Sequence, residues 1–124
     1  MYETLEILRD GGVTTIWMNR PDVHNAFNEQ LIAELTAACQ ALDADDAVRV
    51  VVLAGRGKSF SAGADLNWMR RAADASVDAN LADARKLAGM LRSLAEMNKP
   101  TIARVHGAAL GGGMGLASAC DICV

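Results

Sequence analysis

The stretch GAALGGGMGLAS, residues 107–118, places three consecutive glycines between a strand-like segment and a helix-like one. The strand-like segment is TIARV at 101–105, and residues 114–120 have the pattern of a helix. Glycine loses more conformational freedom on folding than any other residue. A glycine cluster therefore indicates a strained turn or a backbone that must approach another group closely, and the question is which group that is.

A second loop of the same design lies earlier in the chain. VRVVVLA (48–54) is a β-branched run that predicts a parallel strand covered on both faces. The loop GRGKSFSAG (55–63) and a short helix near 65–72 follow it. Backbone N–H groups at a helix N-terminus are unpaired and favour negative charge. Two such loops brought together could direct one N–H each at a single oxygen, which is an oxyanion hole. Alternatively, the glycines only permit tight turns and close helix packing.

Neither glycine-rich loop fits the sequence pattern of the two standard kinds of nucleotide-binding loop. A P-loop ending in GRGKS requires glycine five positions before Gly57, where the chain has Val52. The dinucleotide pattern G-x-G-x-x-G fails in both loops, because Phe60 and Leu116 stand where the third glycine should be. The sequence thus argues against a nucleotide site of either standard kind.

The segments around these loops predict an α/β domain. YETLEIL (2–8) and VTTIWM (13–18), joined by Asp10-Gly11-Gly12, predict a β-hairpin. A turn-rich loop (19–28) ends in Asn28, which is a suitable N-cap for a helix at 29–43. That helix has an apolar face made of Leu31, Ile32, Leu35, Cys39 and Leu42. Residues 77–96 also keep a helical period, with an apolar stripe made of Leu81, Ala84, Leu87, Ala88, Leu91 and Leu94. With a strand beginning at Asp121, the order predicts a largely parallel sheet.

The composition of the chain limits the classes of molecule that it is expected to bind. The 124 residues are 52% apolar and carry a net charge of −3, which argues against binding to nucleic acid or to an anionic membrane. No apolar run approaches the roughly 20 residues that cross a bilayer. The opening residues lack the pattern of a signal peptide. Three cysteines without an export signal predict reduced thiols and a cytoplasmic protein.

Three motifs together resemble the crotonase, or enoyl-CoA hydratase/isomerase, superfamily. They are NRPDVHNAFN (19–28), SFSAGADLNWM (59–69) and KPTIARVHGAALGGGMGLASACDI (99–122), in the family's order and spacing. The stretch GRGKSFSAGADLNWMRR is most similar to methylglutaconyl-CoA hydratases of leucine and isoprenoid catabolism. The resemblance implies a crotonase-like (ClpP/crotonase) fold of repeated β-β-α units. Residues 1–124 would then be the N-terminal portion of such a domain, with the C-terminal portion absent.

The resemblance also implies roles for particular residues. The backbone N–H groups of Ala64 and Gly112 would hold the thioester oxygen of an acyl-CoA as it becomes an enolate. The CoA itself would be bound by Val23, Ala26, Ala62, Ala64, Asp65, Leu66 and Gly112. For Asp65 the alternative is helix N-capping, which is compatible with a ligand contact. No metal and no separate cofactor are expected, because CoA is part of the substrate.

The chain departs from the family pattern at one catalytic position. Many hydratases of the family carry a glutamate two positions after the glycine triplet, where this sequence has Gly115. The general acid or base would then come from a later loop beyond Val124. His106 could act as a base but is better explained as a strand-end residue bonded to backbone, and His24 as a turn residue.

Five further side chains have structural interpretations. Asp121 matches a helix-to-strand junction, and the Cys120–Cys123 pair predicts two small buried residues rather than a metal or redox site. Trp68 and Met69 either wall the acyl pocket or belong to the core.

The function implied is hydration of an α,β-unsaturated acyl-CoA by an enoyl-CoA hydratase-type lyase of fatty acid or leucine catabolism. The alternatives are an enoyl-CoA isomerase and a non-catalytic acyl-CoA-binding fragment. Relatives of this kind are usually homotrimers or hexamers.

Overall fold

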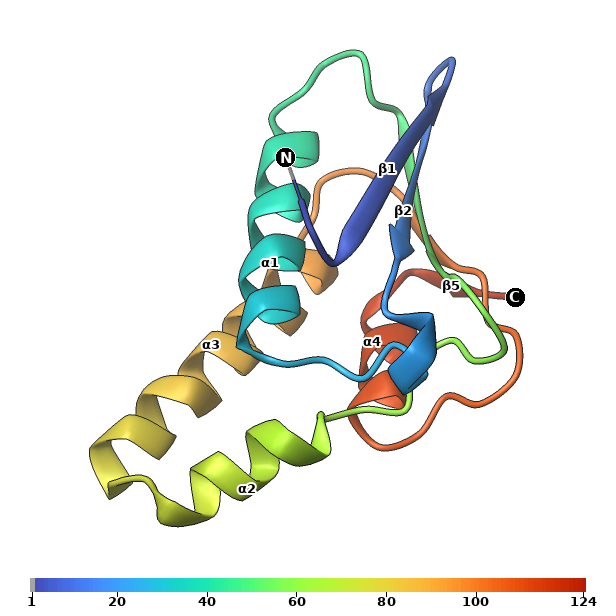
Figure 1. Ribbon diagram of the computed structural model, residues 1–124. Helices are drawn as coiled ribbons and strands as arrows, with labels where there is room; N and C mark the ends of the chain where they lie inside the picture. Colours follow the sequence, from blue (N-terminus) through green and yellow to red (C-terminus); the bar gives the residue numbers. More distant parts are fainter. Residues whose placement is uncertain (1) are drawn as a thin grey trace.

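The computed structural model describes residues 2–124 as a twisted five-stranded sheet with helices packed against it (Figure 1). The strands follow one another across the sheet in chain order, from β1 to β5. They are β1 (Leu5–Asp10), β2 (Val13–Met18), β3 (Val50–Gly55), β4 (Thr101–Ala103) and β5 (Ile122–Cys123). The helices are the 3-10 turn η1 (Pro21–Val23), α1 (Glu29–Asp43), α2 (Leu66–Asp74), α3 (Val77–Ala95) and α4 (Gly112–Ala119).

The strand directions confirm the predicted hairpin and the largely parallel sheet. Strands β1 and β2 are antiparallel, with Leu5 opposite Met18, and Gly11 takes the left-handed φ of +60° that their tight turn requires. The pairs β2–β3, β3–β4 and β4–β5 are all parallel. Since parallel strands share their carboxyl ends, the loops that follow β2, β3 and β4 lie at one edge of the sheet.

Helix α1 has the predicted limits and the predicted apolar face. The Asn28 side chain caps its N-terminus by accepting a 3.0 Å hydrogen bond from the Leu31 amide. The five predicted apolar residues of this helix, with Ala38, are buried. They pack over the sheet together with β2 and β3 side chains such as Ile16 and Leu53, and this layer is the core.

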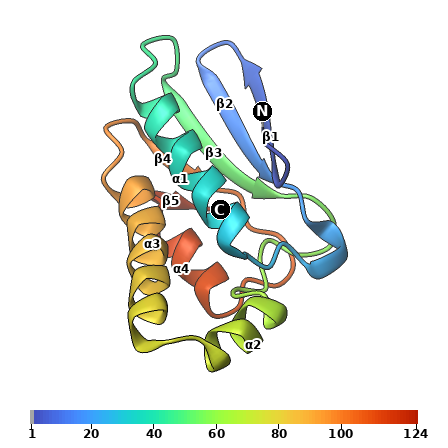
Figure 2. The ribbon, with the colours of Figure 1, turned by 60° about the vertical axis from the view of Figure 1, so that its left-hand side comes forward.

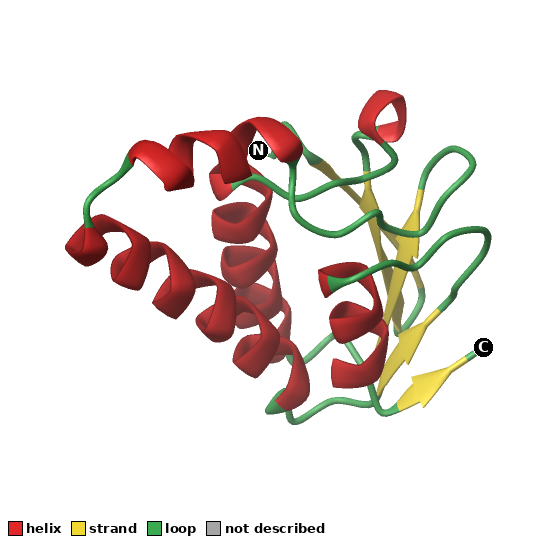
Figure 3. Ribbon diagram, turned by 90° about the horizontal axis from the view of Figure 1, so that it is seen from below, coloured by secondary structure: helices red, strands yellow, loops and turns green. Residues whose placement is uncertain are grey.

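The expectation that β3 is covered on both faces is wrong for the described residues. Val51 and Leu53 are buried, whereas the intervening Val50 and Val52 remain half-buried. The long helices lie on one side of the strands, and within residues 2–124 no helix covers the other side (Figure 3). Leu8 and Val13, at 47% and 42% exposed, are on this uncovered face.

Helices α2 and α3 form an arm that projects from the core, in the lower part of Figures 1 and 2. Helix α2 contains no buried residue, and in α3 only Met90 and Leu94 are buried. The predicted apolar stripe of α3 is therefore buried near its C-terminal end, whereas Leu81 is 47% exposed. Within the described residues no helix combines the length and apolarity of a membrane span.

Candidate active site

Three loops meet at the carboxyl edge of the parallel strands, and backbone hydrogen bonds join them. The loop after β2 is joined to the loop after β3: the Ala62 amide donates to the His24 carbonyl at 2.9 Å, and the Phe27 amide to the Gly63 carbonyl at 2.8 Å. The loop after β3 is joined to the loop after β4 by the Leu110 amide, which donates to the Ser61 carbonyl at 3.0 Å. The two glycine-rich loops therefore do come together. We call this arrangement the loop junction (residues 19–28, 56–65 and 104–111).

Two glycines of the triplet are explained by close approach to the junction, and the third, Gly111, by its left-handed φ of +52°. A β-carbon on Gly112 would collide with the Phe27 ring, and one on Gly113 would collide with the Ser61 carbonyl. Any larger residue at these two positions would push α4 away from the other two loops. The close approach here is between protein groups, and its result is to bring the N-terminus of α4 against the loop that follows β3.

At and beside the loop junction, the backbone N–H groups of Ala64 and Gly112 are among those with no acceptor among the described residues. On either side of Ala64, the Gly63 carbonyl and the Asp65 amide are both bonded to Phe27. Gly112 is the first residue of α4, where a helix amide has no intrahelical partner. A β-carbon on Gly63 would lie 3.2 Å from the Gly112 nitrogen, so the two donor residues are close neighbours. Two free donors side by side can stabilise one oxyanion.

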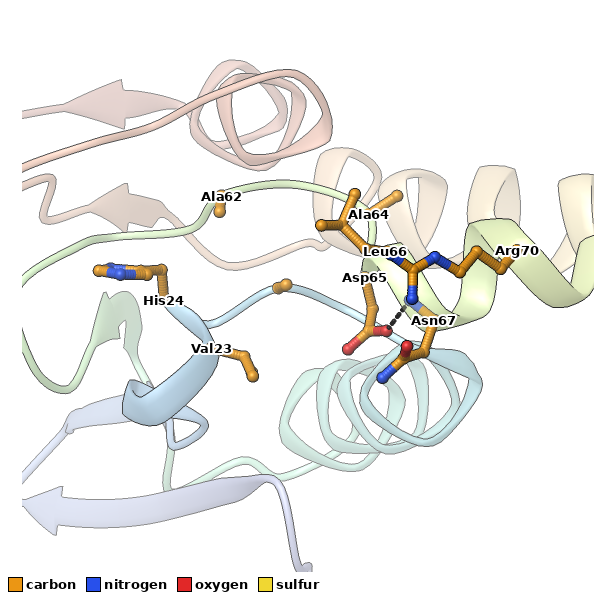
Figure 4. Close-up of a pocket in the computed structure, with 9 residues that line it drawn as sticks. Val23, His24, Ala62, Ala64, Asp65, Leu66, Asn67 and Arg70 are labelled. Atoms are coloured by element: carbon orange, nitrogen blue, oxygen red, sulfur yellow. Dashed lines mark hydrogen bonds between the residues drawn. The ribbon is translucent and has the colours of Figure 1, made fainter.

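A cavity of about 520 Å³ opens beside Ala64 (Figure 4). Its lining includes six of the seven residues predicted to bind CoA: Val23, Ala26, Ala62, Ala64, Asp65 and Leu66. The seventh, Gly112, does not line the cavity. Its nitrogen lies close to Gly63, which stands between the lining residues Ala62 and Ala64. The structure thus gathers the predicted residues around one hollow, from η1, the β3 loop and the start of α2.

Asp65 is the N-cap of α2, as one of the two sequence interpretations proposed. Its Oδ1 accepts hydrogen bonds from the Asn67 and Trp68 amides at 2.8 and 3.1 Å. Its Oδ2 lies 3.2 Å from Nη2 of Arg20. Burial raises the pKa of this carboxyl, but the hydrogen bonds from Trp68, Arg20 and Asn67 outweigh burial and leave the pKa below its usual value. The carboxylate thereby holds the β2 loop against α2; a contact with CoA stays a prediction.

Three residues that line the cavity were not predicted to bind CoA: His24, Asn67 and Arg70. Arg70 is exposed at the cavity, where its cation suits an anionic ligand. Its position could have been found from sequence, because Arg70 follows Leu66 by four residues and so shares its helix face. His24 contacts Ser59 through Nδ1, 3.0 Å from Oγ.

Asn25 is the most important residue that the sequence analysis missed. It is fully buried and takes a left-handed φ of 54°. Its Oδ1 accepts from the Arg20 amide at 2.8 Å, and its Nδ2 donates to the carbonyls of Arg56 and Ser59 at 2.8 and 2.9 Å. One side chain therefore ties the β2 loop to the β3 loop. The turn preference of asparagine signalled the backbone conformation but not these partners.

Two of the remaining candidates are structural. His106 Nε2 lies 2.6 Å from the Gly57 carbonyl, as expected for a strand-end residue bonded to backbone. The Asp121 carboxylate accepts from the Thr101 amide at 2.9 Å, which confirms its place at a helix-to-strand junction.

The two cysteines of the C-x-x-C pair are both free thiols. The prediction that both are buried is wrong, since Cys120 is partly buried and Cys123 is exposed. Burial raises the pKa of the Cys120 thiol to about 11, which keeps it protonated. Among the described residues no group of three His, Cys, Asp or Glu side chains is placed to hold a metal ion.

Trp68 packs against the core and Met69 does not. The Trp68 ring makes an edge contact with Phe27 at 6.4 Å between centroids, and its buried Nε1 has no acceptor among the residues described. Met69 is 52% exposed. Neither residue lines the 520 Å³ cavity.

Comparison with known proteins places the chain in a family. The family model described as enoyl-CoA hydratase/isomerase matches residues 9–124. A probable enoyl-CoA hydratase of Rhizobium meliloti is 46% identical over 99% of this chain and 46% of its own length. A 4-chlorobenzoyl coenzyme A dehalogenase of an Arthrobacter species is 39% identical over 91% of this chain and 41% of its own length.

Solved structures agree with the family match. The crystal structure of a putative enoyl-CoA hydratase/isomerase (crotonase) from Legionella pneumophila is 45% identical and superposes with a TM-score of 0.94. The match covers 98% of this chain and 47% of that one, which confirms the crotonase-like fold. The chain spans about half the length of the curated relatives it matches. It belongs to the enoyl-CoA hydratase/isomerase family.

Proposed function

We propose that the whole protein containing this chain hydrates an α,β-unsaturated acyl-CoA. The observation that carries the proposal is the pair of unpaired backbone N–H groups, Ala64 and Gly112, beside a cavity large enough for part of a CoA thioester. The family match supports the class of substrate.

The chemistry follows from where charge develops. When water adds to the β-carbon of an enoyl thioester, negative charge moves to the thioester oxygen. Two N–H groups fixed by the loop junction would stabilise that charge without having to reorganise. Since Gly112 begins α4, the helix dipole adds to the stabilisation. Both groups act through backbone, so a small residue at each position leaves the oxygen room to enter.

The cavity residues would hold the CoA moiety. Ala62 and Ala64 would line the path of the pantetheine chain, and Val23 and Leu66 would provide apolar walls. Arg70 would face a CoA phosphate. The reaction needs no further cofactor, because CoA is the carrier of the acyl group.

The proton and the water would be handled by a carboxylate supplied from outside the described residues. Gly115 offers no titratable group, and the titratable side chains lining the cavity within residues 2–124 are His24, Asp65 and Arg70. Of these, Asp65 is engaged in capping α2 and in its ion pair with Arg20. This distribution also favours the second candidate, an acyl-CoA-binding protein without turnover. Isomerisation of an enoyl-CoA would use the same two amides with a differently placed base.

The finer proposal is a 3-methylglutaconyl-CoA-like substrate in leucine catabolism, based on the motif in residues 55–71. We further propose a cytoplasmic protein that assembles as a homotrimer or hexamer. The loss of enoyl absorbance measures the hydration of 3-methylglutaconyl-CoA and crotonyl-CoA by the whole protein.

A donor-deletion variant tests the two amides. Ala64→Pro removes an N–H that has no protein partner, so we expect kcat to fall by about 10²–10³ while CoA-thioester binding is retained. Ala64→Ser keeps the N–H at nearly the same size and serves as the matched control. Unchanged turnover in Ala64→Pro would contradict the oxyanion-hole assignment. Binding without turnover in the unmutated protein would establish the binding function instead.

A further inference from the structure

Two helical glycines are not explained by the fold. Gly89 lies within α3 and Gly115 within α4, and neither has a positive φ. A β-carbon on Gly89 would meet nothing within 4 Å, and one on Gly115 would meet only Leu91 Cδ2 at an ordinary 3.9 Å. Alanine would fit at both positions and would stabilise both helices. Packing within residues 2–124 therefore does not require glycine at either position.

Gly115 has a position in the proposed site that Gly89 lacks. It follows Gly112 by three residues, so the two share a face of α4 one helical turn apart, or about 5 Å. If the Gly112 amide holds the thioester oxygen, the β-carbon of the acyl group would lie about one helical turn away, beside Gly115. The residues that line the CoA cavity, among them Val23 and Leu66, do not include Gly115. An acyl group that points away from this cavity would run towards Gly115.

The helices near Gly115 carry apolar side chains that are incompletely buried. Leu87 and Leu91 of α3 and Trp68 of α2 are partly buried, and Met114, next to Gly115, is 58% exposed. Figures 1 and 2 both show the N-terminal end of α4 beside α2, with α3 running past it. A hydrocarbon substituent would find apolar surface there on three helices.

We propose that Gly115 is a specificity-determining residue that leaves room for a substituent on the β-carbon of the acyl group, so that the substrate class is 3-branched acyl-CoA. This inference rests on the proposed function, since it needs the thioester oxygen to lie at Gly112. The missing side chain at residue 115 leaves the space of a methyl group or more, facing Leu91.

Two saturated thioesters that differ by one methyl test the proposal by binding alone. Butyryl-CoA is straight, and isovaleryl-CoA carries a methyl on the β-carbon. The whole protein is titrated with each by calorimetry, and Gly115→Ala, Gly115→Val and the matched control Gly89→Ala are compared with it. We expect Gly115→Val to weaken isovaleryl-CoA binding by about tenfold or more and butyryl-CoA binding by less than about twofold, with a smaller difference for Gly115→Ala. Gly89→Ala should change neither.

The outcomes separate this inference from the proposed function. If the unmutated protein binds both thioesters and the Gly115 variants change both affinities alike or not at all, the specificity role is wrong and the proposed function stands. If the unmutated protein binds neither, both fail. Thermal unfolding checks the fold of each variant, and Gly115→Ala should melt at or above the unmutated temperature because alanine favours the helix.

Discussion

The loop junction and the α2–α3 arm are built on opposite principles. The junction is held by buried polar groups, among them Asn25 and Ser61, both 0% exposed. The arm has no buried residue in α2, and the start of α3 is exposed, with Val77 at 82%. This difference in burial matches two different structural requirements. Backbone donors must be fixed to stabilise a charge, whereas apolar walls around a substrate need only apolar surface near the site.

The variant with the largest expected effect is Asn25→Ala, which breaks the loop junction. Asn25→Ala leaves the Arg20 amide and the carbonyls of Arg56 and Ser59 without their partner. Each buried orphan costs about 1–3 kcal/mol, so we expect the free energy of unfolding to fall by about 4 kcal/mol. Urea unfolding followed by circular dichroism measures the loss. The control is the N-cap variant Asn28→Ala, which should lose about 1 kcal/mol; equal losses would show that Asn25 is an ordinary turn residue.

A comparison within α3 locates where the arm joins the core. Leu94 is 1% exposed and Leu81 is 47% exposed. Leu94→Ala should lower the free energy of unfolding by about 3 kcal/mol, because it leaves a cavity in the core. Leu81→Ala at the arm should cost less than about 1 kcal/mol. Similar losses for the two variants in the same urea titration would mean that the arm is packed against something in solution.

The Asp65 carboxyl predicts a dependence of stability on pH. Its pKa is lowered in the fold, because hydrogen bonds from the Trp68 amide, Arg20 and the Asn67 amide together outweigh burial. The stabilisation is therefore complete above the unfolded pKa of about 3.9 and is lost as pH falls through the lower folded pKa. Asp65→Asn keeps the cap and loses the ion pair, so its melting temperature should fall less between pH 5 and pH 3 than that of the unmutated chain. Parallel melting curves would refute a role for the charge.

The smallest effect concerns the Trp68 indole. Its Nε1 is buried without an acceptor among the described residues, so Trp68→Phe removes a cost along with some packing against Phe27. The free energy of unfolding should change by less than about 1 kcal/mol in either direction. A clear loss beyond that, measured by the same urea titration, would show that the N–H has a partner in solution.

Local signals predicted the parts of the molecule that depend on local sequence. The hairpin at Gly11, the cap at Asn28 and the α1 face follow from turn chemistry and periodicity, and all are observed. The meeting of the two glycine-rich loops followed from the common direction of parallel strands. The Asn25 bonds could not be predicted, because they join residues 31 and 34 positions away. The uncovered face of β3 was missed because β-branched composition does not say which neighbours are present.

The parallel bridges of the junction, Phe27 with Ala64 and Ser61 with Ala109, also bear on how the site forms. Each bridge closes a long segment of chain, and the two segments contain α1 with β3 and α2 with α3 with β4. Closing such a long segment costs entropy, which the packing of the intervening elements must offset. The two amides are held in register by both bridges, so a chain in which either bridge is unformed would have no such site to offer.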